Sequence, residues 1–421
     1  MLIFVLMKCI SMLLSVALAL SCGARPPQTE TMDQLRDRVF DLAKVQAVYM
    51  DSLLPEGRCP RTVQGDTLVT SDIGWWTSGF YPGVLWRLFF VTGERTFWEL
   101  AIKHTVPLAG LLDRETDHDI GFQLMSSFGP LRDFSRRSDL SRYSSILGSN
   151  ANRPDPDTVN EILNGGAAKL AARFVPEAGV IRSWNWGPWN IPVIIDNMMN
   201  LELLDAAEAP SALRHEYLEI AEKHALTTLE NHFREDGTVW HLVDYADDGT
   251  VLGRQTVQGY ADDTAWARGQ AWALYGYARM AEARAGWAEP EVHFQPFYDA
   301  AAKLEAWLLE NLPEDGIPYW DFSQSDYKDA SAAAIIACGL LKMWQLRDCP
   351  ADDPALAMAE RILRTLASPE YLAEPGTNGG FLLKHSVGNK PGNSEVDVPL
   401  TYADYYFLEA LTRVSGERLS D

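Results

Sequence analysis

Segments with the helical spacing of apolar residues fill most of the chain, whereas the alternation of apolar and polar residues that is typical of strands is scarce. Four of these segments directly follow an aspartate, namely Asp196, Asp263, Asp329 and Asp404. The gaps between these aspartates are 67, 66 and 75 residues. Because Asp often begins a helix and a regular period indicates repeated units, we predict an all-α fold built from repeated helix pairs.

A second set of helices lies between the first and has charged faces, as in residues 213–233 and 294–312. The first set is shorter, more apolar and more aromatic, as expected for helices buried on most sides. Its earlier members are predicted to begin near Ser78 and Asp119. Six pairs would form an α/α six-hairpin toroid, an (alpha/alpha)6 barrel whose inner helices begin around one opening. A helical solenoid with ordinary Asp caps is the alternative, but loops such as SWNWGPWN (183–190) favour the closed toroid.

Charge limits the classes of partner. The 36 Lys and Arg against 58 Asp and Glu give a formal charge of −22, and no basic cluster stands out, so nucleic acid is excluded as a partner. An acidic substrate would need a local cationic group, because the overall field repels anions. The 14 Trp and 15 Tyr suit sugar faces but equally suit helical cores.

The N-terminus has the pattern of an export signal. A charged start near Met7, an apolar stretch and Ser21-Cys22 resemble a bacterial lipoprotein signal, so we assign residues 1–22 to a signal peptide and expect lipidation at Cys22. Simple cleavage is the alternative. The prediction is an exported protein at the periplasm or cell surface, with membrane contact only through that anchor, since no later segment is long and apolar enough to span a bilayer.

The other cysteines of the mature chain, Cys59, Cys338 and Cys349, fit no metal motif. One disulfide is compatible with an oxidising compartment. Cys338 lies in an apolar helical stretch and is predicted to be a buried thiol.

Five motifs in order carry a family resemblance: DIGWWTSGFYPGVLW (72–86), HDIGF (118–122), RSWNWG (182–187), PVIIDNMMNLELL (192–204) and QGYADDTAWARGQAWALYG (258–276). Together they resemble the unsaturated glucuronyl hydrolases of glycoside hydrolase family 88. The resemblance covers nearly all of the mature chain, so residues 30–421 are predicted to be a single catalytic domain. It implies removal of the 4,5-unsaturated uronic acid that polysaccharide lyases leave at a non-reducing end, by hydration of the ring double bond. No cofactor is implied.

This chemistry requires a proton donor. An enol ether reacts when an acid protonates its carbon, and a base must then help to deprotonate the attacking water. The resemblance assigns this acid/base role to Asp196 and makes Asp119 the second essential carboxylate. Burial and a nearby second carboxylate would raise the pKa of Asp196 toward neutrality. A helix cap is the structural alternative for both residues, with a tie to His118 as a further one for Asp119.

The substrate carboxylate requires a cation. Arg268 and Trp272 are four residues apart and share a helix face, so a guanidinium can bind the carboxylate while an indole covers the sugar. The resemblance also assigns Gln258, Trp266 and Trp272 to substrate binding, and His241 to the site by a less certain alignment. Core packing for the Trp residues, a surface ion pair for Arg268 and a structural role for His241 are the alternatives.

Trp76 and Trp184 are predicted to be walls of the site, with the adjacent Trp75 and the nearby Trp186 as alternatives. Asp262 next to Asp263 raises the question of a metal, but an acidic pair at a helix start is more often a cap and dipole partner. We therefore predict no metal.

Two other functions compete with this interpretation. An unsaturated rhamnogalacturonyl hydrolase of the related family 105 is one, although WTSGFYPG and HDIGF favour the glucuronyl branch. A non-catalytic surface glycan-binding lipoprotein is the other, although binding alone would not require Asp119 and Asp196 together with Arg268. The parent polysaccharide, which includes chondroitin, hyaluronan and heparin as candidates, its sulfation and the oligomeric state are left open by the sequence.

Overall fold

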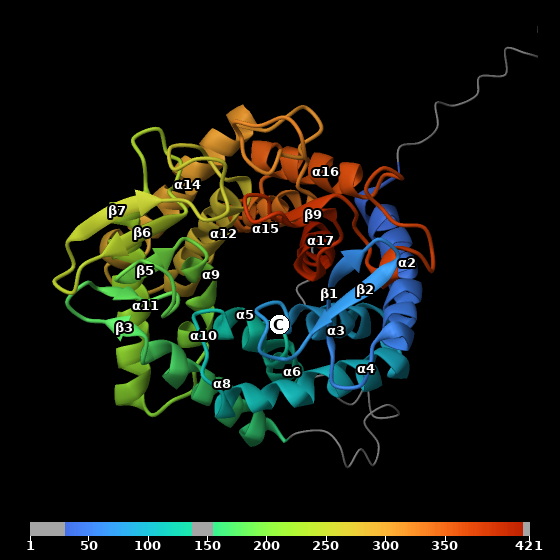
Figure 1. Ribbon diagram of the computed structural model, residues 1–421, viewed down its shortest axis with the longest axis horizontal. Coiled ribbons are helices and arrows are strands. Elements are labelled where there is room, and N and C mark those ends of the chain that lie inside the picture. Colours follow the sequence, from blue (N-terminus) through green and yellow to red (C-terminus); the bar gives the residue numbers. More distant parts are fainter. Residues whose placement is uncertain (1–29, 137–154, 416–421) are drawn as a thin grey trace, which may run out of the picture.

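The computed structural model describes residues 30–136 and 155–415, and these form two concentric layers of helices (Figure 1). The predicted signal peptide (1–22), with Cys22, lies outside the described residues. Around the centre lie α3 (Phe80–Thr92), α5 (Ile120–Met125) with α6 (Phe128–Ser135), α9 (Asn197–Asn200) with α10 (Glu202–Asp205), α12 (Ala267–Arg284), α15 (Ala330–Leu346) and α17 (Thr401–Val414). These helices contact their neighbours in this order, and α17 packs on α3, so the inner layer is closed.

The outer layer alternates with the inner one along the chain. It consists of α2 (Met32–Leu53), α4 (Arg95–Thr105), α8 (Pro156–Ala171), α11 (Ser211–His232), α14 (Gln295–Asn311) and α16 (Pro354–Leu366). The short α13 (Pro290–His293) and the 3-10 helices η1 (Val106–Asp113) and η3 (Asn378–Gly380) lie in connections. The toroid predicted from the sequence is therefore the observed fold.

Burial explains why the two sets of helices differ in composition. In the inner helix α15, 14 of the 17 residues are buried, and its sequence is accordingly almost entirely apolar. In the outer helix α16, 5 of 13 are buried, so one apolar stripe is enough. Cys338 is a buried free thiol in α15, as predicted, and Cys59 and Cys349 are free as well.

The strands are short and form antiparallel pairs that the hydrophobic pattern did not predict. They are β1 (Cys59–Gln64) with β2 (Thr67–Ser71), β3 (Phe174–Val175) with β4 (Val180–Ile181), β8 (Ser386–Asn389) with β9 (Ser394–Val398), and a three-stranded sheet of β5 (Ile191–Ile194), β6 (Leu242–Tyr245) and β7 (Val251–Gln255). Every one of these strands lies in a connection from an outer helix to the next inner helix. They therefore gather at the end of the ring where the inner helices begin.

Two of the four predicted helix starts are correct. Asp329 directly precedes α15, and its side chain accepts a hydrogen bond from the Ser331 N–H at 3.0 Å. Asp196 directly precedes α9.

The other two predicted starts were wrong. Helix α12 begins only after Trp266, whose extended backbone (φ −63°, ψ 120°) keeps Asp263 outside the helix. Helix α17 begins at Thr401, so Asp404 lies in its first turn. The Asp404 carboxyl instead accepts hydrogen bonds from the N–H groups of Leu382 and Leu383, both at 2.8 Å, and so fixes a neighbouring loop.

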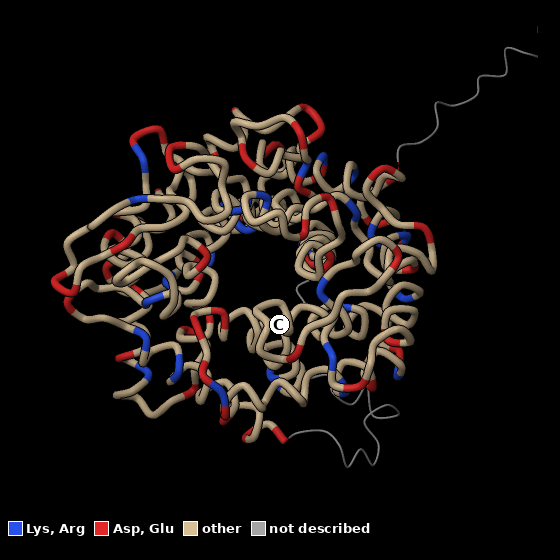
Figure 2. Tube along the Cα trace, in the orientation of Figure 1, with Lys and Arg blue, Asp and Glu red and all other residues tan. Residues whose placement is uncertain are grey.

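Acidic and basic residues are interspersed around the ring (Figure 2). Within residues 30–136 and 155–415, no helix combines the length and the apolar character needed to cross a membrane.

Candidate active site

The three-stranded sheet brings three predicted site residues to one place. Ile194 at the end of β5 pairs with Leu242 at the start of β6, which pairs with Gln255 at the end of β7. Asp196 follows β5, His241 precedes β6 and Gln258 follows β7. The sheet therefore aligns these side chains, although 62 residues separate the first from the last.

Asp196 does not act as a helix cap. Although it stands directly before α9, its side chain makes no capping hydrogen bond, and its Oδ2 atom is buried without a hydrogen-bond partner among the described residues. The residue is 8% exposed, and burial raises the pKa of its carboxyl to about 7 against the opposing effect of the Arg268 charge. A carboxyl in this state can give and take a proton near neutral pH.

His241 faces Asp196 in a defined tautomer. Its Nδ1 accepts the backbone N–H groups of Val257 at 3.0 Å and Gln258 at 3.3 Å. The remaining nitrogen, Nε2, therefore carries the proton, and it lies 3.8 Å from Asp196 Oδ2. Burial, with a further contribution from the Arg268 charge, lowers the pKa of His241 well below its usual range, so the ring is neutral.

His118 and Asp119 form a second histidine–carboxyl pair, in which the histidine nitrogen that faces the carboxyl is an acceptor rather than a donor. His118 Nδ1 donates to the carbonyl of Ser183 at 2.9 Å, which leaves Nε2 as an acceptor 3.3 Å from Asp119 Oδ1. Burial lowers the pKa of His118. The pKa of Asp119 is raised well above its usual range by burial and by the charges of Asp117 and Asp196. The surroundings of Asp119 therefore favour its protonated form beside a neutral imidazole.

Asn200 connects the segment that contains Asp119 to the segment that contains Asp196. Its Oδ1 accepts the backbone N–H of Phe122 at 2.6 Å, and its amide nitrogen donates to the backbone carbonyl of Asp196 at 3.3 Å. The approach requires a glycine, because a Cβ on Gly121 would lie 2.5 Å from Asn200 Oδ1. The start of α5, with Asp119, is thereby fixed against α9, with Asp196.

Arg268 lies in the first turn of α12 and is 2% exposed. Its guanidinium donates to the carbonyls of Val387 and Gly388 and to the side-chain oxygen of Gln258. Asp329 faces it, with Oδ2 at 3.6 Å from Nη1, and that oxygen has no hydrogen-bond partner in the described part of the chain. The cation is thus fixed in place by backbone carbonyls and one buried acid.

Aromatic rings surround these polar groups. Trp266 lies beside both His241, at 4.4 Å between ring centroids, and Arg268, whose guanidinium carbon is 4.6 Å from the ring centroid. Trp272 is fully buried, yet its indole N–H has no partner within the described ranges. The ring of Tyr402 lies 5.5 Å from the guanidinium carbon of Arg268.

The sequence left Trp75 as an alternative to Trp76, and Trp186 as an alternative to Trp184, for the walls of the site. Trp76 packs on Tyr402 at 4.8 Å between centroids, which places it beside the cluster, whereas Trp75 lies under Arg61. Trp184 is 6.2 Å from the His118 ring, and Trp186 stacks on its other side at 4.7 Å and is 60% exposed. Of the two alternatives in each pair, Trp76 and Trp184 therefore lie nearer to the polar side chains of the site.

Asp117, His118 and Asp119 offer three ligand atoms within 4.8 Å of one another, which is a geometry that a metal can use. The predicted metal-free site therefore stays a prediction. Asp262, by contrast, is used locally, since its carboxylate accepts the Thr256 N–H at 2.8 Å.

Comparison with known proteins places this chain in a family. The chain is 38% identical to an unsaturated glucuronyl hydrolase from Formosa agariphila over 348 residues, which cover 80% of this chain and 79% of the relative. This chain belongs to the unsaturated glucuronyl hydrolase family. A second member, from a Bacillus species, is 30% identical over 85% of this chain and 91% of its own length. No protein-family model matches the chain.

Solved structures of the family have the same fold. The crystal structure of an unsaturated glucuronyl hydrolase specific for heparin superimposes with a TM-score of 0.79 at 37% identity, over 91% of this chain and 98% of the other. The Bacillus enzyme superimposes with a TM-score of 0.75 at 27% identity, over 89% and 94% of the two chains. These similarities confirm the resemblance, the six-hairpin fold and the glycosidase class predicted from the sequence, and they favour the glucuronyl over the rhamnogalacturonyl branch.

Several residues beside the site were not singled out from the sequence. Asn200 lies inside the motif that contains Asp196, but nothing in its local pattern indicates a partner 78 residues away. Asp329 was recognised only as a helix start, and its second role toward Arg268 depends on the packing of α12 on α15. Tyr402 comes from the last inner helix, and no motif contained it.

Proposed function

We propose that this protein removes the 4,5-unsaturated uronic acid from the non-reducing end of lyase-generated oligosaccharides, with Asp196 as the general acid and base. The observation that carries the proposal is the buried Asp196 carboxyl, which has a pKa of about 7 and a free oxygen directed at a neutral histidine. A cap or a core acid would have its oxygens satisfied.

In this mechanism the protonated Asp196 gives its proton to the β-carbon of the enol ether, and positive charge develops on the carbon bonded to the ring oxygen. Water attacks that carbon, and the Asp196 carboxylate takes the proton that the water loses. The product is a hemiketal, which opens and expels the rest of the sugar. The acid is regenerated in the same step that consumes the water.

The neighbours of Asp196 support each half of this cycle. The His241 Nε2–H is directed at the carboxyl oxygen, so it can stabilise the carboxylate that forms after proton donation. The raised pKa of Asp119 favours its neutral form opposite His118, and a neutral Asp119 adds no second negative charge to a site that must accept an anionic substrate.

Arg268 and Gln258 are the proposed recognition groups for the uronate carboxylate. They lie in contact with each other beneath Trp266, in a chain whose overall charge is −22. The fixed guanidinium supplies the local cation that the substrate requires. Trp76, Trp184, Trp266 and Trp272 are the proposed aromatic walls.

Glycosaminoglycan disaccharides are the proposed substrate class. The solved structure at 37% identity is described as specific for heparin, and the Bacillus enzyme as responsible for the degradation of glycosaminoglycan. A Streptococcus pneumoniae relative at 28% identity is named an unsaturated chondroitin disaccharide hydrolase. A panel of lyase-generated disaccharides from heparin, chondroitin and hyaluronan, followed by loss of the ultraviolet absorbance of the double bond, tests the proposal. Absence of turnover on the whole panel would contradict it.

We also propose that the mature protein is attached to a membrane through lipidated Cys22 and acts at the periplasm or cell surface. The support is the Ser21-Cys22 sequence after an apolar stretch. The Cys22→Ala variant should be released from the membrane fraction or remain unprocessed. Membrane attachment with unchanged gel mobility in that variant would refute the anchor.

A further inference from the structure

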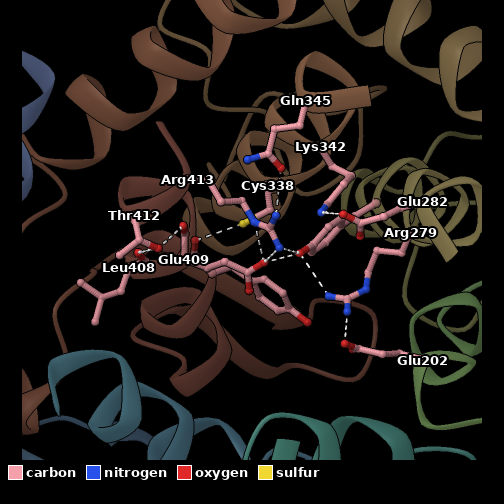
Figure 3. Close-up of polar contacts among 12 residues, drawn as sticks. Glu202, Arg279, Glu282, Cys338, Lys342, Gln345, Leu408, Glu409, Thr412 and Arg413 are labelled. Carbon is pink, nitrogen blue, oxygen red and sulfur yellow. Dashed lines mark hydrogen bonds and ion pairs between the residues drawn. The ribbon is translucent and has the colours of Figure 1, made fainter. Parts of the chain in front are cut away.

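A polar cavity lies at the opposite end of the ring from the candidate active site. Its volume is about 380 Å³, and it is lined by residues from the later turns of the inner helices, among them Arg87, Glu202, Arg279, Lys342 and Glu409. Figure 3 shows the last four of these with their polar contacts. Arg279 follows Arg268 by eleven residues on α12, so the two guanidinium-bearing positions are roughly 16 Å apart along the helix. This far-end cavity is therefore separate from the proposed reaction site.

One carboxylate in the far-end cavity serves two guanidinium groups. Glu409 Oε2 accepts from Arg87 at 2.6 Å, and Oε1 accepts from Arg413 at 2.7 Å and also from the Tyr275 hydroxyl. Burial raises the pKa of Glu409, but the surrounding Arg charges outweigh it and hold that pKa far below its usual range. A single negative charge therefore faces two fixed positive charges.

The remaining cations of the cavity have one acidic partner each. Arg279 pairs with Glu202, and Lys342 Nζ donates to Glu282 at 2.5 Å. Asp133 is the fourth acid of the lining. Its carboxylate lies 3.0 Å from the guanidinium of Arg132, which does not line the cavity. The cations Arg87, Arg279, Lys342 and Arg413 thus exceed the acids that pair with them by one.

Donor groups in the cavity also remain unused. The buried Nε–H of Arg87 has no hydrogen-bond partner among the residues that the structure describes. The Lys342 side chain is 5% exposed, and burial together with the Arg413 charge lowers its pKa to about 7. A buried ammonium that has one carboxylate partner and a guanidinium nearby is stabilised by a further anion beside it.

Neutralisation of helix C-termini does not account for these cations. Arg87 and Arg279 lie inside their helices rather than in the last turn, and the printed partners of Arg87, Arg279 and Lys342 are side chains, not the terminal carbonyls. Arg87, Arg279 and Lys342, from α3, α12 and α15, all line the same cavity. Figure 3 shows Arg279 and Lys342 with their acidic partners.

We propose that the far-end cavity binds a compact oxyanion, a carboxylate, sulfate or phosphate, between Arg87, Arg279 and Lys342. Oxygen atoms of such a ligand accept charge-assisted hydrogen bonds from guanidinium and ammonium donors. The cavity is much larger than one sulfate, so a sugar acid and an inorganic ion are both compatible with its size.

The test is equilibrium dialysis of the full mature chain against radiolabelled sulfate at up to about 10 mM and at slightly acidic pH, where Lys342 is charged. Parent protein should bind sulfate, and Arg279→Gln and Lys342→Gln should each weaken binding by roughly tenfold or more. Glucuronate as a competitor distinguishes the source: displacement indicates a sugar acid as the ligand class, and no displacement indicates an inorganic oxyanion. Lys303→Gln removes an exposed positive charge elsewhere and should bind as the parent does.

Arg268→Gln separates this cavity from the candidate active site, because it removes the buried cation proposed to bind the substrate carboxylate there. We expect Arg268→Gln to lose turnover and keep sulfate binding, and Lys342→Gln to keep turnover and lose sulfate binding. Lys342→Gln decides the matter if Arg279→Gln fails to fold, since its partner Glu282 has a side chain that is 50% exposed and can be hydrated. Sulfate binding that disappears in Arg268→Gln and persists in Lys342→Gln, or no sulfate binding by the parent, would overturn the proposal.

Discussion

The Nε2–H of His241 and the Oδ2 atom of Asp196 lie 3.8 Å apart, and neither has a hydrogen-bond partner within the described part of the chain. Two buried groups left in this state cost stability, which a protein core normally avoids. The arrangement is explained if both groups are used only when a substrate is bound. The carboxyl holds a proton at neutrality, and the imidazole N–H is ready for the carboxylate that remains after the proton is given.

The first prediction concerns the pH dependence of turnover. Because the acid form of Asp196 starts the reaction and its pKa is about 7, kcat/KM should fall about tenfold per pH unit at pH values well above 7. Initial rates from the absorbance of the double bond, measured across this range at saturating and low substrate, give the profile. A rate that stays constant far above neutrality would show that another group is the acid.

The second prediction separates acid/base chemistry from helix capping. Asn caps a helix about as well as Asp, so Asp196→Asn should keep the fold, while loss of the proton donor lowers kcat by roughly a hundredfold or more. Asp263→Asn is the matched control, because Asp263 is exposed and lies ahead of the next inner helix without capping it. Near-normal turnover by Asp196→Asn would end the assignment of Asp196.

The third prediction tests the role of Asp119. If Asp119 stays protonated, Asp119→Asn replaces one neutral group with another and should leave the alkaline limb of the pH profile almost unmoved. It should still lower kcat if the Asp119 proton moves during turnover, because the amide N–H that replaces it can donate a hydrogen bond to His118 Nε2 but cannot be transferred as an acid. A clear downward displacement of the alkaline limb would instead mean that Asp119 is charged and raises the pKa of Asp196.

Much of the fold could be predicted because helix periodicity is local. The inner and outer layers differ in how many sides of each helix are buried. That difference is visible in the composition of segments such as 330–344 of the inner layer and 213–233 of the outer layer. The short strands could not be predicted, because the two residues of β3 or the four of β5 give no measurable alternation. It is those strands, not the helices, that bring His241 to Asp196.

Apart from His241, which was assigned by a less certain alignment, the site residues that were predicted all lie inside one of the five motifs. Asp196, Asp119 and Arg268 were found in this way, whereas Asp329 and Tyr402 reach Arg268 from other helices. The same limit explains the mistaken helix start at Asp263. Hydrogen bonds between the Thr264 hydroxyl and Asp321, 57 residues away, hold the preceding turn, and no local pattern indicates them.

The fourth prediction concerns metal ions. We expect turnover without added metal and in the presence of a chelator, because Asp117, His118 and Asp119 would have to lose the Asp119 proton to bind a cation. The measurement compares rates of parent protein before and after exhaustive dialysis against chelator. Activity that disappears and returns with a divalent ion would identify those three residues as a metal site.

The fifth prediction concerns stability. The folded state raises the pKa of Asp196 from 3.8 to about 7, so it binds that proton more tightly than the unfolded chain does. The resulting stabilisation is present below the unfolded pKa and is lost as the pH rises through about 7. At about 1.4 kcal/mol per pKa unit, the whole change is about 4 kcal/mol, most of it above about pH 5.

Asp196→Asn has no such proton to lose. The difference in Tm, Asp196→Asn minus parent, should therefore increase by a few degrees between about pH 5 and pH 8. The substitution that stops turnover thus stabilises the protein under alkaline conditions. Asp263→Asn, at an exposed position, should show a Tm difference that does not change with pH. Thermal unfolding of the three proteins in parallel measures this. Parallel pH curves for parent and Asp196→Asn would mean that Asp196 is hydrated or paired in the folded protein, and the argument for its acid role would lose its physical basis.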